Sequence, residues 1–128
     1  MLRRVMGTVG GIVVAMVAIG LIEWLGRQIF PPPAGVDMTD PAAIGRAVGM
    51  LPLGLKASVS AAWFLGTLAG GLAGLAIARW RGVPWIVAAV VVLAAMANYV
   101  MIPHPLWMQI AGIALPPLAA MLALRLRG

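Results

Sequence analysis

Cysteine is absent from this chain of 128 residues, and acidic residues are nearly absent, with three Asp and Glu side chains in all. The lack of cysteine excludes disulfide exchange, thiolate catalysis and cysteine-ligated metal. Charged residues make up 9% and hydrophobic residues 63% of the chain, whereas soluble domains average about 25% charged and roughly 45–50% apolar. With a mean hydropathy of +1.07, the composition indicates a protein embedded in a membrane.

Motifs that carry chemistry are also missing from the sequence. It contains no Ser-His-Asp order, HExxH, P-loop or GxGxxG motif, so none of the common hydrolytic or nucleotide-binding sites is predicted. The single histidine, His104, has Met101 and Met108 close by in the sequence. Imidazole with thioethers can bind Cu(I), but methionine more often fills apolar cores. We therefore expect no cofactor and favour a protein that is not an enzyme.

The net charge of +6 reflects missing acids more than a basic surface. Six of the nine basic residues flank apolar segments on one predicted side, namely Arg3, Arg4, Arg79, Arg81, Arg125 and Arg127. An excess of Lys and Arg on one side is the signature of cytoplasmic loops. Membrane lipids, and not nucleic acid, are therefore the expected partners.

Four long apolar segments predict an all-α, membrane-embedded four-helix bundle with one domain. The predicted spans are about 5–30, 53–79, 84–102 and 105–126, each long enough for the roughly 20 residues that cross a bilayer. Pro31-Pro32-Pro33 ends the first segment, while Pro84 and Pro105 begin the third and fourth. Proline is favoured in the first turn of a helix and disrupts its interior, so these boundaries do not depend on hydropathy alone.

Charge distribution predicts that both termini are cytoplasmic. The first outer connection, about 31–52, contains Asp40-Pro41, a capping carboxylate before a first-turn proline. Apolar residues follow at helical spacing, at Ile44, Val48 and Leu51. We expect a short interfacial helix in this connection.

Small residues at four-residue spacing predict close helix packing. The first span has Gly7, Gly11 and Ala15, and the second has Gly66, Gly70 and Gly74. Such stripes let membrane helices approach closely, either against each other or between copies in a homo-oligomer. Trp63, in the second span, is expected to face lipid or a partner.

Pro116-Pro117 interrupts the fourth span and predicts a kink. Broken helices can mark the binding sites of transporters. A kink tolerated by neighbouring helices is the interpretation we favour, because no charged residue lies beside the prolines.

Polar residues gather in the predicted outer half of the spans, which makes this half the candidate polar site. The candidates are Glu23, Arg27, Lys56, Asn98, Tyr99 and His104. An acid inside a membrane span is costly and usually has a partner. Arg27 follows Glu23 by four residues, on the same helix face, so Glu23 is expected to be either part of a structural ion pair or a proton- or cation-sensitive acid.

The segments Phe30-Pro31-Pro32-Pro33-Ala34-Gly35 and Asn98–Trp107 (NYVMIPHPLW) resemble small four-helix membrane proteins of bacteria that are described only as hypothetical proteins. The resemblance implies a multi-pass protein of the bacterial inner membrane and brings no activity with it. Small multidrug-resistance transporters also have a first-helix glutamate, but theirs lies deeper in the helix and in a different motif.

Three functions stay open from the sequence. The first is an accessory or scaffold subunit that packs against itself or another membrane protein. The second is a small oligomeric transporter or channel, with Glu23, Asn98 and His104 lining an outer vestibule. The third is a binder of a lipid headgroup or lipophilic ligand at the outer leaflet, where Arg27, Arg46, Lys56 and His104 could meet a phosphate.

Overall fold

The computed structural model describes residues 2–30, 39–40, 42–43, 53–101 and 106–127. Its four long helices are α1 (Leu2–Ile29), α3 (Leu53–Ala78), α4 (Val83–Met101) and α5 (Leu106–Arg127). All four are long and apolar enough to cross a membrane. The prediction of an all-α protein with four such helices is confirmed.

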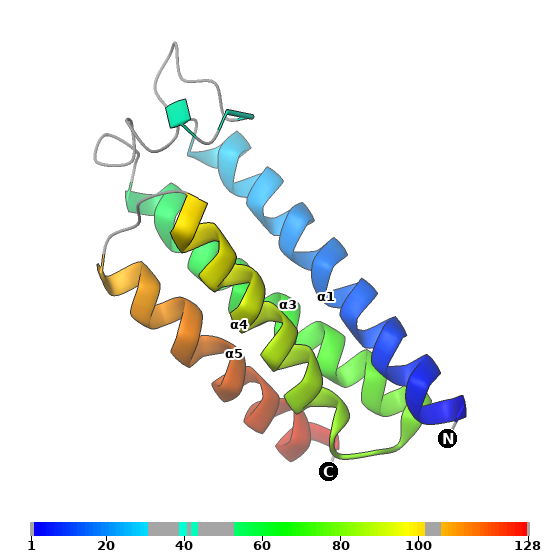
Figure 1. Ribbon diagram of the computed structural model, residues 1–128. Helices are drawn as coiled ribbons and strands as arrows, with labels where there is room; N and C mark the ends of the chain where they lie inside the picture. Colours follow the sequence, from blue (N-terminus) through cyan, green and yellow to red (C-terminus); the bar gives the residue numbers. More distant parts are fainter. Residues whose placement is uncertain (1, 31–38, 41, 44–52, 102–105, 128) are drawn as a thin grey trace.

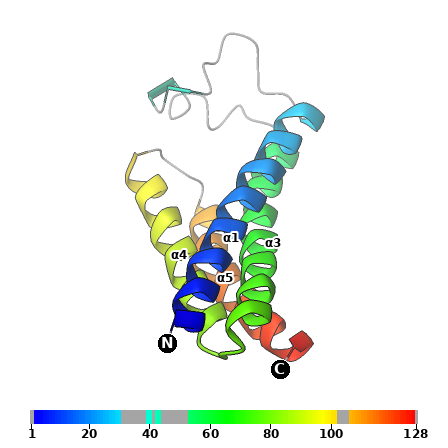
Figure 2. The ribbon, with the colours of Figure 1, turned by 90° about the vertical axis from the view of Figure 1, so that its right-hand side faces the viewer.

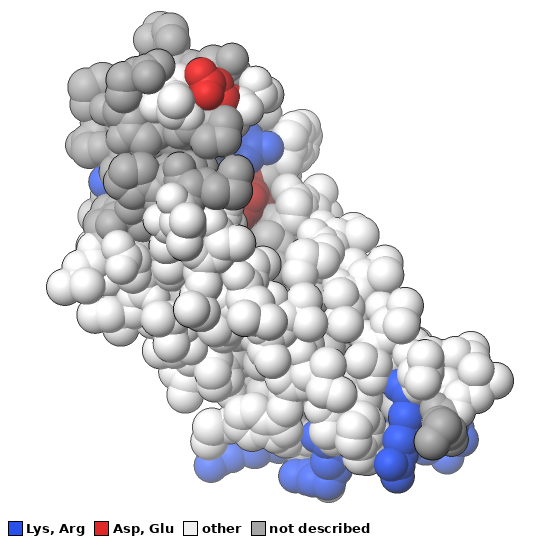
Figure 3. Space-filling view, in the orientation of Figure 1, with Lys and Arg blue, Asp and Glu red and all other residues white. Residues whose placement is uncertain are grey.

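Neighbouring helices along the chain run in opposite directions, so the bundle has two unlike ends (Figure 1). Both termini lie at one end, together with the turn between α3 and α4. We call this the arginine end, because it carries Arg3, Arg4, Arg79, Arg81 and Arg125. The opposite end, where α1 and α4 finish and α3 and α5 begin, is called the connection end. Figure 3 shows basic side chains along the arginine end, with mostly uncharged residues on the described surface between the two ends.

The effect of a proline's missing N–H group depends on where in a helix the proline lies. Pro84 is the second residue of α4, in the first turn, where the N–H has no helical partner in any case. Pro116 and Pro117 lie inside α5, which the structure describes as one helix from Leu106 to Arg127. Each leaves a carbonyl one turn earlier without its usual N–H donor. The kink expected at this point stays a prediction.

The two small-residue stripes lie against each other along α1 and α3. A Cβ atom added at Gly7 would meet Ala78 and the carbonyl oxygen of Gly74, and one at Gly11 would lie 2.7 Å from the carbonyl oxygen of Gly70. A Cβ at Gly66 would lie 3.0 Å from the carbonyl oxygen of Ala15. The two backbones are therefore in direct contact over three turns, which only Gly and Ala permit.

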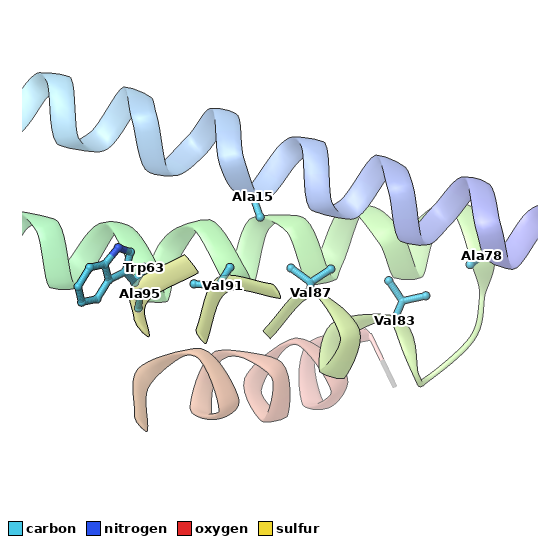
Figure 4. Close-up of a cluster of buried hydrophobic side chains, with 7 residues drawn as sticks. All are labelled: Ala15, Trp63, Ala78, Val83, Val87, Val91 and Ala95. Atoms are coloured by element: carbon cyan, nitrogen blue, oxygen red, sulfur yellow. The ribbon is translucent and has the colours of Figure 1, made fainter. Parts of the chain in front are cut away.

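The main core lies where α4 packs into the groove between α1 and α3. Buried side chains from these helices form one cluster, made of Ala15, Trp63, Ala78, Val83, Val87, Val91 and Ala95 (Figure 4). Trp63 is only 4% exposed, so the expectation that it faces lipid or a partner was wrong. Its indole fills the space beside Ala95 at the wide end of the cluster, which the hydropathy of α3 alone could not reveal.

Side chains at the arginine end tie α1 to the end of α3. Arg3 Nε donates a hydrogen bond of 2.8 Å to the carbonyl oxygen of Ile77, one of the last carbonyls of α3, which have no helical donor. The guanidinium of Arg4 lies 4.9 Å from the centroid of the Trp80 ring, within cation–π range. Arg79 ends α3 with a φ of 52°, the left-handed conformation in which a helix commonly terminates.

The predicted interfacial helix lies almost wholly outside the described residues. Its expected cap is described in part, because the backbone N–H of Ala42 donates a 3.1 Å hydrogen bond to Asp40 Oδ1. This is the bond of an N-cap aspartate to the second residue of a helix. Ile44, Val48 and Leu51 lie outside the described residues.

Candidate functional site

Glu23 and Arg27 lie on α1 in its last two turns, toward the connection end. Both side chains are partly buried, since this face of α1 continues the stripe that packs on α3. Arg27 is the positive charge that acts on the Glu23 carboxylate. The partly buried acid therefore has a basic neighbour one turn later on the same helix.

Asn98 lies on α4 near the connection end, and its side chain is exposed. Figure 2 shows that the end of α4 lies apart from the end of α1 at the connection end. The exposed face around Asn98 also includes Ala97, the residue before it, and Ala94, one helical turn earlier. The structure thus places an amide and two small residues on an outward face of α4.

Tyr99, the next residue, is held inside the α4–α5 pair. Its hydroxyl donates a 2.8 Å hydrogen bond to the carbonyl oxygen of Met108. Its ring meets that of Trp63 edge to face, with centroids 5.9 Å apart at 73°, a favourable aromatic geometry. A Cβ added at Gly112 would collide with the Tyr99 hydroxyl, so this glycine provides the space for the phenol.

Met108 and Gly112 were missed as neighbours of Tyr99 from the sequence. Their position one turn apart on α5, with a glycine, is a weak signal of a site where a large side chain enters. Tyr99, Trp63 and Gly112 therefore pack α3, α4 and α5 against one another. The Tyr99 hydroxyl takes part in this packing through its hydrogen bond to α5.

Lys56 lies in the first turn of α3 with its side chain partly buried. Its carbonyl oxygen accepts a 3.4 Å hydrogen bond from Ser60 Oγ. His104 and Arg46 lie outside the described residues. Among the predicted polar residues that the structure describes, Glu23 and Arg27 lie one turn apart on α1 and Asn98 and Tyr99 are consecutive on α4.

A second polar feature lies at the arginine end. A cavity of about 340 Å³ is lined by Arg81, Met121, Leu124 and Arg125, between the α3–α4 turn and the last turns of α5. A separate apolar groove of about 390 Å³ lies between α4 and α5, lined by residues that include Trp85, Leu93 and Pro117. The arginine-end cavity joins two guanidinium groups to an apolar floor, which sequence analysis did not single out.

These groups can take part in charge interactions and hydrogen bonds. Within the described ranges, no three His, Cys, Asp or Glu side chains come together as metal ligands. In the same ranges, no buried side-chain N or O atom lacks a hydrogen-bond partner. The groups at the described surface that could bind a partner are the arginines and the exposed amides of Gln28 and Asn98.

Comparison with known proteins adds no family and no relative to these geometric observations. No protein-family model matches the chain, and neither the curated proteins nor the solved structures include a match.

Proposed function

We propose that this protein is a small accessory or scaffold subunit of the bacterial inner membrane, with the arginine end in the cytoplasm. The observation that carries the proposal is the exposed face of Ala94, Ala97 and Asn98 on α4. The glycine stripes of α1 and α3 are occupied by each other, so a partner helix needs a different surface. Small residues beside an amide provide one, because interhelical hydrogen bonds and close backbone approach stabilise contacts in lipid.

Asn98 differs from the other exposed amide, Gln28 of α1, in what lies beside it. An amide on an exposed helix face in an apolar environment gains free energy from a partner's hydrogen bond, about 0.6 to 2 kcal/mol in membranes. Asn98 has Ala94 and Ala97 beside it, which allow close approach, whereas Gln28 has the large exposed side chains of Trp24 and Leu25 one turn before it. The α4 face is therefore the proposed docking surface for a second copy or for another membrane protein.

Single-cysteine crosslinking tests this proposal, and the absence of native cysteine makes every introduced thiol unique. Ala97→Cys places the thiol on the α4 face, and Leu25→Cys places one on the exposed face of α1, toward the same end of the bundle. In native membranes, Ala97→Cys is expected to give a specific disulfide dimer or, with a bifunctional reagent, an adduct with one other membrane protein. Leu25→Cys is expected to give neither.

Replacement of Asn98 tests whether its side-chain amide contributes to the crosslinked contact. Asn98→Leu should weaken the crosslink formed at position 97, while Gln28→Leu, which removes another exposed amide at the same end of the bundle, should leave it unchanged. A protein that remains monomeric and uncrosslinked in native membranes would contradict the accessory role.

A transporter or channel is the second proposal, and the half-buried acid in α1 is the observation that favours it. Intramembrane acids frequently belong to ion pathways, and Glu23 lies partly buried on α1, one turn from Arg27. Flux into liposomes containing the purified protein, compared between the wild type and Glu23→Gln, tests this role. A flux that Glu23→Gln leaves unchanged removes its basis.

A further inference from the structure

We propose that the arginine-end cavity binds the phosphate of an anionic phospholipid. Arg81 and Arg125 would hold the phosphate, and Met121 and Leu124 would contact the glycerol and the first carbons of an acyl chain. The site lies at the opposite end of the bundle from the polar residues singled out in the sequence. It does not depend on the accessory role, because it uses other residues and another ligand.

Packing of α5 on α3 and α4 brings the two arginines to one cavity. A Cβ added at Gly71 of α3 would lie 3.3 Å from the Cβ atoms of both Ala123 and Pro84. At this point three helices therefore meet at close range, just before Arg125 on α5 and just after Arg81 in the α3–α4 turn. Leu124 is buried in a cluster with Leu75 and Ala123, so the floor of the cavity belongs to the packed core.

The two guanidinium groups lack an acidic side chain to neutralise them. The three acids of the chain are Glu23, Asp37 and Asp40. Glu23 follows Arg4 by 19 positions on one continuous helix, which amounts to about 28 Å at 1.5 Å per residue. Asp40, the aspartate that the structure describes, comes after the far end of α1 in the chain. Guanidinium donors without a carboxylate match phosphate oxygens, which they can bind in a bidentate manner.

An adjoining cavity makes a lipid a better occupant than a soluble phosphate. This second cavity, of about 210 Å³, is lined by Leu118, Met121, Leu122 and Arg125. It shares Met121 and Arg125 with the first cavity and continues along α5 toward the middle of the bundle. A phosphate between the arginines would thus have an apolar path beside it for an acyl chain. Basic pockets between helices at the cytoplasmic side are the expected sites for anionic headgroups.

The test is a titration of the purified full-length protein in a nonionic detergent, with bound lipid counted by native mass spectrometry. Phosphatidylglycerol is the anionic probe, phosphatidylcholine is the zwitterionic probe, and glycerol 3-phosphate is the soluble probe. The cavity variant is Arg81→Gln/Arg125→Gln. The matched control, Arg4→Gln/Arg79→Gln, removes two charges from the same end without changing a residue that lines the cavity.

For the wild type, phosphatidylglycerol should bind at least tenfold more tightly than phosphatidylcholine, and glycerol 3-phosphate should not displace it at equal concentration. With about 1 kcal/mol per arginine near an anionic lipid, the cavity variant should lose about thirtyfold in affinity. The control should lose less than about threefold. Equal losses in both double variants would overturn the proposal, because diffuse attraction to the arginine end would then explain binding.

The lipid affinities of the wild-type protein test the proposal even if the cavity variant fails to fold. Equal affinity for the anionic and zwitterionic lipids would overturn the proposal without any variant. Displacement of the lipid by an equal concentration of glycerol 3-phosphate would also overturn it, since the apolar path would then contribute nothing. Circular dichroism and thermal melting of each variant establish which affinities are compared between folded proteins.

Discussion

Gly70 is the residue at which the packing of α1 on α3 can be tested most sharply. A Cβ atom at this position would collide with the carbonyl oxygen of Gly11 and would lie 2.7 Å from the Cβ of Ala15 and 3.1 Å from its backbone N. Two of these three atoms belong to the backbone, and the third is bonded to it directly. No flexible side chain can move aside, so Gly70→Ala must push the two helices apart.

The magnitude follows from a comparison with Gly20→Ala. Gly20 also lies inside a helix, but a Cβ at that position meets nothing within 4 Å. Both substitutions gain the helix propensity of Ala over Gly, about 1 kcal/mol, so this gain cancels in the difference. What remains is the cost of overpacking at Gly70, about 2–3 kcal/mol given the backbone contacts.

The assay is the free energy of unfolding in mixed micelles, measured by titration with a denaturing detergent and followed by circular dichroism. Gly20→Ala should be as stable as the wild type or slightly more stable. Gly70→Ala should unfold at a free energy about 2–3 kcal/mol below that of Gly20→Ala. If both variants unfold together, the stripes do not pack against each other within one chain, and a contact between copies becomes the better interpretation.

The same titration checks three further substitutions. Tyr99→Phe removes the hydrogen bond to the carbonyl oxygen of Met108 and should cost about 1 kcal/mol; an unchanged free energy of unfolding would contradict that bond. Arg79→Gly relieves the left-handed conformation at the end of α3 and should raise the free energy of unfolding by about 1 kcal/mol, whereas a decrease would argue against this conformation. Thr67→Val removes a buried hydroxyl bonded only to Trp63 of its own helix and should change stability by less than about 0.5 kcal/mol; a larger loss would show that Thr67 contributes to packing between helices.

The four helices were predictable because length and hydropathy determine a membrane span almost alone. Pro84 predicted where α4 starts, and the helix begins at Val83 with Pro84 as its second residue. The glycine stripes also indicated where α1 and α3 could meet, since four-residue spacing of small residues is specific for close contact. A contact within one chain and a contact between copies gave the same pattern, so only the structure separates them.

The environment of individual polar residues was not predictable from the sequence. In an apolar helix, the hydrophobic pattern does not distinguish a lipid-facing side from a buried one. Trp63 therefore could not be assigned to the core, and Asn98 could not be distinguished from its neighbour Tyr99, which is engaged with α5. The cavity of Arg81 and Arg125 depends on the three-helix contact around Gly71, which joins segments far apart in the chain.

The measurement that tests the account most directly is the side of the membrane on which each end of the bundle lies. Leu2→Cys places a unique thiol at the exposed start of α1, at the arginine end, and Ala42→Cys places one in the exposed part of the connection between α1 and α3. With a membrane-impermeant maleimide applied to intact bacterial cells whose outer membrane is permeable, Ala42→Cys should be labelled at once. Leu2→Cys should be labelled only after the inner membrane is lysed. Labelling of Leu2→Cys alone in intact cells, or of both variants, would contradict the proposed membrane-spanning arrangement.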